Sequence, residues 1–350
     1  MNKEPSLYGI RKSNRKNNDY WTKNKFNSAF PVSLANYMRD KDILAQYIRL
    51  DKNLQPVIES IDIGELYNAK DTPNEELYFG FEQRYEPYQK YGYETIPNID
   101  LIVKSGEDFL RPLEVKLTVI PDSTTKDLEV EDWGSELVIR PPTTTYCALG
   151  MMDACTDSMD EIRGIFEPGC STIDSWSNVS EISLNMPMFI DMINEFESRF
   201  YNRQQPLLMQ PIWKTEGQSP ILAEDAFDMF VWSDYAFSRL FIDSSLGTRA
   251  GNVSRQMRST ARLARCIYDI SRSGKVRIDE VYRQMAFNYQ TDKEFSVSGA
   301  VTNRYMRSPR LKSPIVPRDA LYDIILNGGE KLLMPERRFD QTIYFTMKRD

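Results

Sequence analysis

Apolar residues alternate with other residues in two neighbouring stretches of the chain, and this alternation predicts a β-hairpin. They occupy the odd-numbered positions of residues 99–103 and again of residues 113–117. Alternation with a period of two is typical of a strand with one buried face. Residues 105–108, which read Ser-Gly-Glu-Asp, have the composition of a turn. The sequence therefore predicts two antiparallel strands joined by a tight connection.

The rest of the pattern predicts helices on both sides of this hairpin and further strands in the same layer. Strands mixed with helices in this order favour an α/β fold, with a mixed central sheet flanked by helices. We expect a polar N-terminal arm at 1–30, a core with an insertion at 31–222, and a helical, basic region at 223–350. The predicted helices are 31–50, 74–90, 143–153 and 187–202, and the other predicted strands are 57–63, 137–139 and 206–213.

Three charged side chains of the hairpin form the candidate site. Glu114 and Lys116 are two residues apart on one strand, so they share a face opposite the apolar positions. Asp100, on the other strand, can meet them across the ladder. Two converging carboxylates repel each other unless a cation joins them, and Mg²⁺ binds through one or two carboxylates. We therefore expect Asp100 and Glu114 to be metal ligands, and Lys116 to orient a water and stabilise negative charge.

The spacing of these three residues is weakly specific by itself, because an ordinary exposed strand pair would also show it. The alternation around each acid and the turn between the strands make the catalytic interpretation stronger. Glu82 is a further catalytic candidate, since we expect it on a helix just before the hairpin, where it would complete a metal shell. The alternative for Glu82 is a solvated helix residue without a role.

Composition excludes several kinds of chemistry. The chain has no histidine, so Ser-His-Asp and Cys-His catalysis, HNH-type nuclease chemistry and Cys/His zinc sites are excluded. Its cysteines form no C-x-x-C pair, and they are expected to be reduced thiols. No apolar stretch of membrane-spanning length and no signal-peptide pattern is present. These features predict a cytoplasmic protein. The four cysteines are Cys147, Cys155, Cys170 and Cys266.

Charge is distributed unevenly along the chain. The whole chain has a net charge of −7, but residues 239–318 contain 16 Lys and Arg against six Asp and Glu. A local basic region on an acidic body is what binding to a polyanion needs. Arginines three or four residues apart predict a basic stripe on one helix for DNA phosphates, although a solvated helix face would look the same. The stripe consists of Arg255, Arg258, Arg262 and Arg265, and a second, loop-like group for base contacts consists of Arg304, Arg307 and Arg310.

Several segments in the first 145 residues carry a family resemblance. They are residues 21–31 (WTKNKFNSAFP), 81–82, 113–118 (LEVKLT), 121–125 and 134–141. With these segments the chain resembles the HindVP-type restriction endonucleases, a branch of the PD-(D/E)xK nucleases. It departs from the wider motif at Asn98, where an acid would be expected, and the acid lies instead at Asp100.

The resemblance implies a type II restriction endonuclease that cuts double-stranded DNA at a short, partly degenerate palindrome, with a GRCGYC-like site as one candidate. A palindrome implies a two-fold dimer, because each subunit then meets an equivalent half-site. A DNA methyltransferase that protects host DNA is the expected genetic partner. Three alternatives remain open: a repair or recombination nuclease of the same fold, a DNA-binding regulator without chemistry, and an interaction protein whose basic helix packs on an acidic partner.

Overall fold

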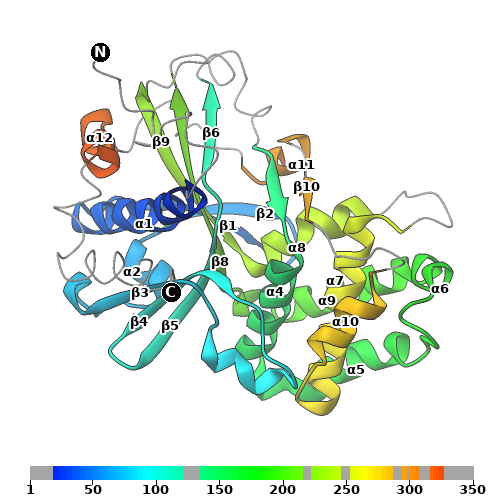
Figure 1. Cartoon of the computed structure of the whole chain (residues 1–350). Coiled ribbons are helices and arrows are strands. Elements are labelled where there is room, and N and C mark those ends of the chain that lie inside the picture. Colours follow the sequence, from blue (N-terminus) through cyan, green and yellow to red (C-terminus); the bar gives the residue numbers. More distant parts are fainter. Residues whose placement is uncertain are drawn as a thin grey trace.

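A large mixed β-sheet forms the centre of the computed structural model, with helices on both of its faces (Figure 1). The structure describes residues 19–121, 135–215, 222–245, 253–286, 294–297, 299–306 and 316–326. Within these residues the sheet has eight strands, in the order β2-β1-β9-β8-β5-β4-β3, with β6 also paired to β8. They are β1 (Ala45–Leu50), β2 (Pro56–Ile61), β3 (Leu77–Gln83), β4 (Ile99–Ser105), β5 (Asp108–Val115), β6 (Thr118–Pro121), β8 (Pro206–Thr215) and β9 (Leu222–Ser233).

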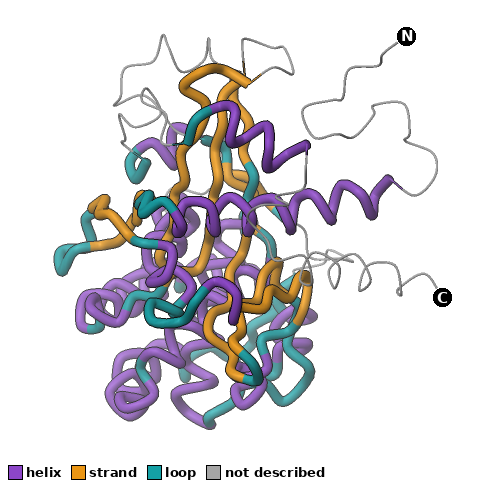
Figure 2. Tube along the Cα trace, turned by 90° about the vertical axis from the view of Figure 1, so that its left-hand side faces the viewer, coloured by secondary structure: helices purple, strands orange, loops and turns teal. Residues whose placement is uncertain are grey.

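The two faces of the sheet carry separate hydrophobic cores because successive side chains of a strand point to opposite faces. On β9, Phe230 and Trp232 join one core, whereas Met229 and Val231 join the other. The second core is covered by α1 (Asp19–Asp40), α2 (Ile63–Tyr67) and α12 (Arg318–Leu326). In Figure 2 the long helix α1 runs across this face of the sheet.

The first core lies under most of the other helices. Its central helix is α9 (Arg255–Ser273), which packs most extensively against four neighbouring helices and is buried along most of its length. It begins at the N-cap Ser254, whose side chain accepts from the Met257 amide, and ends at Gly274 in the left-handed conformation. The neighbours are α4 (Pro141–Ala154), α5 (Met159–Cys170), α7 (Met186–Arg199) and α8 (Asp234–Ile242).

The predicted hairpin is confirmed. β4 and β5 pair in antiparallel register, with Leu101 opposite Leu113 and Ser105 opposite Asp108. Gly106 in the connection has a φ of 55°, a conformation that glycine adopts without steric cost. On its other side, β4 pairs in antiparallel register with β3, which places Phe81 opposite Leu101.

One predicted helix is confirmed in its first half and wrong in its second. Of residues 31–50, the part up to Asp40 is helical, and Ala45–Leu50 form β1 between β2 and β9 in the sheet. The periodic apolar positions Tyr47 and Ile48 are buried because they face opposite cores, as strand neighbours do. The helix also starts earlier than predicted, at Asp19, so the second part of the predicted polar arm is helical.

The predicted helix 74–90 is wrong because its central part is the strand β3. Short 3₁₀ turns at Asn74–Glu76 and Glu86–Tyr91 flank this strand. Leu77 and Phe81 are four residues apart, a spacing that suits one face of a strand as well as one face of a helix. The period alone therefore did not distinguish the two structures.

The predicted helical region from Ala223 onward begins later than expected. Residues 222–233 form the long strand β9 in the central sheet, and the helices start with α8 at Asp234. The predicted strand 137–139 exists as β7 (Leu137–Ile139), but it pairs with β10 (Phe295–Val297) in a separate two-stranded sheet. The predicted division of the chain into three regions stays a prediction. The remaining elements are α6 (Val179–Leu184), α10 (Ile278–Gln284) and α11 (Gly299–Asn303).

Other predicted elements are confirmed within a few residues. They are the strands 57–63 and 206–213, which correspond to β2 and β8, and the helices 143–153 and 187–202, which correspond to α4 and α7. The α/β class with a mixed sheet flanked by helices is also confirmed. All four cysteines are buried and free. A helix with the length and apolarity of a membrane span does not occur among the described residues.

Candidate active site

Asp100, Glu114 and Lys116 come together at the open end of the β4–β5 hairpin. The Lys116 ammonium lies 3.4 Å from the Asp100 carboxylate and is hydrogen-bonded to the Glu114 carboxylate. The Asp100 carboxylate also accepts a hydrogen bond of 3.0 Å from the Val115 amide. The structure thus brings together the three side chains that the sequence indicated, on the face and in the hairpin that were predicted.

Burial differs among the three side chains and shapes the electrostatics of the site. The Glu114 side chain is only 6% exposed and that of Lys116 17%, whereas that of Asp100 is 31% exposed. Burial raises the pKa of Glu114, and the nearby charge of Asp100 raises it further, although Lys116 opposes both. Burial alone would lower the pKa of Lys116, but the charges of Glu114 and Asp100 outweigh it and raise this pKa. The two acids thus favour the charged form of Lys116, whereas burial and the charge of Asp100 disfavour the charged form of Glu114.

A divalent cation fits this donor set. Two carboxylates, one buried and one more accessible, meet at Lys116, and the negative charge of Asp100 makes ionisation of Glu114 less favourable. A bound cation removes that conflict, and carboxylate oxygens are the protein ligands of Mg²⁺ and similar ions. Among the described residues, no group of three or more His, Cys, Asp or Glu is placed to hold a metal. The site therefore offers two protein carboxylates and leaves other positions to water or substrate oxygens.

Glu82 lies on strand β3 and not on a helix, which corrects its predicted position. The pairs Phe81–Leu101 and Gln83–Ile99 place Glu82 beside Asp100 in the register of the sheet. Its φ is 49°, in the left-handed region that non-glycine residues rarely adopt. The side chain is exposed, and it does not form a three-acid group with Asp100 and Glu114. A catalytic role for Glu82 stays a prediction.

The predicted exposed arginine stripe on α9 is wrong for three of its four members. Arg258, Arg262 and Arg265 are 3%, 1% and 5% exposed, because α9 is enclosed by neighbouring helices. Arg262 lies over the ring of Tyr282, at 5.4 Å from the centroid. Regular spacing located the arginines correctly on one helix, but it did not show that other elements cover that face.

Arg265 illustrates how the buried arginines are used. It donates to the Gln284 side chain at 2.7 Å and lies 3.5 Å from Glu280, both on α10. Its guanidinium also lies over the Trp176 ring, at 5.2 Å from the centroid. Arg265 therefore joins α9 to α10 and to the α5–α6 connection, a structural role inside the protein.

Arg255, the first residue of α9, is the stripe member nearest to solvent. It donates to the Glu294 carbonyl at 2.7 Å. The side chain of Glu294 pairs with Arg140 at 2.9 Å, since both residues lie at the same end of the β7–β10 sheet. The exposed Arg140 and the half-buried Arg255 thus both contact Glu294.

Arg140 is a candidate site residue that the sequence reasoning missed. Partial burial alone would lower its pKa, but the hydrogen bond with Glu294 and the charges of Glu294, Glu114 and Asp100 raise it. The charges of Glu114 and Asp100 therefore reach Arg140. Its place between a strand and the Pro-Pro start of helix α4 was the available signal, because loops after strands carry many functional side chains.

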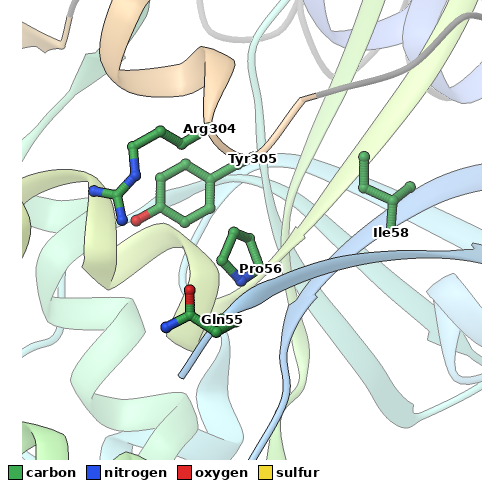
Figure 3. Close-up of a pocket in the computed structure, with 5 residues that line it drawn as sticks. All are labelled: Gln55, Pro56, Ile58, Arg304 and Tyr305. Atoms are coloured by element: carbon green, nitrogen blue, oxygen red, sulfur yellow. The ribbon is translucent and has the colours of Figure 1, made fainter. Parts of the chain in front are cut away.

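Arg304 of the second basic group lies on the surface directly after α11. It pairs with Asp243 at 2.9 Å and has a side chain that is 55% exposed. With the adjacent Tyr305 it lines a pocket of about 420 Å³ against Gln55, Pro56 and Ile58 of the β1–β2 turn and strand β2 (Figure 3). The other two arginines of this group, Arg307 and Arg310, lie outside the described residues.

Comparisons with known proteins identify the family of this chain. The family model for HindVP restriction endonuclease matches residues 21–349. The chain belongs to the HindVP restriction endonuclease family. It is 36% identical to the type II restriction enzyme HgiDI of Herpetosiphon aurantiacus over 348 residues, which cover 98% of this chain and 96% of that protein. It is 35% identical to the probable type II restriction enzyme HindVP of Haemophilus influenzae over 347 residues, 98% of this chain and 94% of that protein. No solved structure matches it significantly.

Membership of the HindVP family confirms the resemblance that the sequence segments indicated. It also identifies the chain as an enzyme, a site-specific deoxyribonuclease of a restriction system. Such enzymes act on DNA and generally use a divalent metal. The family match spans nearly the whole chain, so the helical C-terminal part belongs to the same enzyme as the hairpin site.

Proposed function

We propose that this protein is a type II restriction endonuclease that hydrolyses both strands of DNA at a short, partly degenerate palindrome with Mg²⁺ as its metal. The observation that supports this most directly is the convergence of Asp100, Glu114 and Lys116 in a member of a restriction endonuclease family. The set is that of a PD-(D/E)xK nuclease, with the first acid on one strand and the E-x-K pair on the next. A GRCGYC-like target is one candidate site.

Asp100 and Glu114 are the residues that would hold the metal. A Mg²⁺ ion bound there would neutralise charge on the phosphodiester and lower the pKa of a water. Lys116 lies against both acids as a hydrogen-bond donor, and we assign it the role of a cation in the reaction. Its ammonium orients the attacking water and stabilises the negative charge that forms as water adds to phosphorus and the ester P–O bond breaks.

DNA contacts are expected from exposed cations around this site. We expect Arg255 and Arg140, which both contact Glu294, and Arg304, which pairs with Asp243, to meet DNA phosphates. Arg307 and Arg310 remain candidates for base contacts from the sequence alone. A palindromic target implies a two-fold dimer, and a methyltransferase of the same specificity would protect the host genome.

Digestion of unmethylated plasmid and phage DNA tests this function. We expect discrete fragments that require Mg²⁺, disappear with a chelator, and share one sequence at their ends. Ca²⁺ in place of Mg²⁺ serves as the control for binding without cleavage. Cleavage of branched DNA with intact plasmid left uncut would favour a repair nuclease, and binding without any metal-dependent product would favour a regulator. Either result would contradict the proposal.

A further inference from the structure

Gln210 is a fully buried polar residue on β8 in the part of the sheet that contains the active site. Strands β5 and β6 both pair with β8 in parallel. Glu114 lies opposite Leu208 and Val115 opposite Met209, and the same residue offset continues where Thr118 lies opposite Ile212. This common register places Gln210 opposite Lys116. Neighbouring residues of paired strands point to the same face, so Gln210 and Lys116 lie on one face of the sheet.

All polar groups of the Gln210 side chain are used. Its amide nitrogen donates to the Thr118 hydroxyl at 3.0 Å and to the Ser135 hydroxyl at 2.8 Å. Its carbonyl oxygen accepts from the Trp232 indole nitrogen at 3.0 Å. A buried amide with every partner in place fixes the geometry of its neighbours, because each broken bond leaves a buried polar group without a partner.

The partners of Gln210 belong to the segments that must be aligned for cleavage. Thr118 follows Lys116 by two residues on the same face, and the Lys116 amide between β5 and β6 donates to the Met209 carbonyl of β8 at 3.0 Å. Ser135 accepts a hydrogen bond at its carbonyl from Thr302 of α11, and Trp232 packs on Tyr305 with ring centroids 5.7 Å apart. The segment from Thr302 to Tyr305 carries Arg304, the exposed arginine after α11.

We infer that Gln210 is a positioning residue for Lys116. It fixes the side-chain face of the catalytic strand through Thr118, two residues beyond Lys116, and it aligns that strand with the α11 segment through Ser135. The residue does not contact DNA or metal in this role, and it acts on the rate through the placement of Lys116. The inference rests on the proposed catalytic function of Lys116.

Gln210→Met, which keeps the length of the side chain and removes its hydrogen bonds, tests the inference. Single-turnover cleavage per folded enzyme should fall about 10- to 100-fold, as expected when a catalytic group is misplaced by a fraction of an ångström to one ångström. The Kd for DNA in Ca²⁺ should change by less than about threefold. Thr118→Val should also lower the rate. The double variant should be no slower than Gln210→Met, because both substitutions remove the same Gln210–Thr118 hydrogen bond.

Gln204→Met is the matched control. Gln204 is a buried glutamine just before β8 that bonds the Leu50 backbone and the Ser233 hydroxyl, away from Lys116. This variant should lower the melting temperature but leave the rate per folded enzyme within about threefold. Equal rate losses in the two glutamine variants, or a Gln210→Met rate within threefold of wild type, would overturn the inference. Cleavage at the wild-type rate by Lys116→Ala would instead overturn the proposed catalytic role of Lys116, on which the inference rests.

Discussion

Glu114→Gln is expected to lower Mg²⁺-dependent DNA cleavage by at least about 1000-fold. Glutamine keeps the size of the buried side chain but removes the negative charge, which we propose is a ligand to the metal. Loss of the metal's stabilisation of the transition state raises the activation free energy by several kcal/mol. Each increase of about 1.4 kcal/mol lowers the rate tenfold. The measurement is single-turnover cleavage across a range of Mg²⁺ concentrations.

Glu107→Gln is the control for this substitution, because Glu107 is exposed in the turn of the same hairpin. It removes the same charge from the other end of β5 and should leave the rate within about threefold. Higher Mg²⁺ should recover part of the activity of Glu114→Gln if Asp100 still binds the ion. A Glu114→Gln enzyme with wild-type activity at every Mg²⁺ concentration would contradict the assignment of Glu114.

Arg262→Ala is expected to lower the free energy of unfolding by about 2 to 4 kcal/mol. Arg262 is 1% exposed and lies over Tyr282, so alanine leaves a cavity in the packing around α9 and removes a cation–π contact. Urea unfolding measures the change. Arg262→Met should recover part of the loss, because it keeps the apolar part of the side chain.

Arg304→Ala is the matched comparison, since this arginine is exposed and was predicted for DNA contact together with Arg262. Its stability should change by no more than about 0.5 kcal/mol. The salt dependence of DNA binding should become shallower by about one unit in the log–log slope, the value for one lost phosphate contact. For Arg262→Ala the slope should stay unchanged. A reduced slope with unchanged stability for Arg262→Ala would show that its side chain faces DNA.

The candidate site was accessible from the sequence because it depends on local geometry. The period of two over residues 99–103 and 113–117 fixes which side chains share a face, and the turn between them fixes the pairing. The convergence of Asp100, Glu114 and Lys116 can therefore be predicted without knowing the rest of the fold. The missing histidine narrowed the chemistry further, because it left carboxylates and lysine as the groups for a hydrolytic site.

Features that depend on long-range packing were not accessible in the same way. The apolar positions of β1 and β3 also fit a helical period, and only their partners in the sheet select the strand. The arginines of α9 have the spacing of a surface stripe, but contacts with the neighbouring helices, α10 among them, bury three of the four. Gln210 gave a signal that was not used, since a polar residue within the apolar strand 206–213 is unusual unless it has buried partners.

The most direct test of the proposed site is single-turnover cleavage by Lys116→Ala at saturating Mg²⁺, with DNA binding measured on the same preparation. The structure predicts that the variant binds DNA with a Kd within about threefold of wild type and cleaves it about 100- to 1000-fold more slowly, the loss typical of one charge-stabilising donor. Lys104→Ala, at the other end of the hairpin, should cleave at the wild-type rate. Wild-type cleavage by Lys116→Ala would contradict the assignment of this hairpin as the active site.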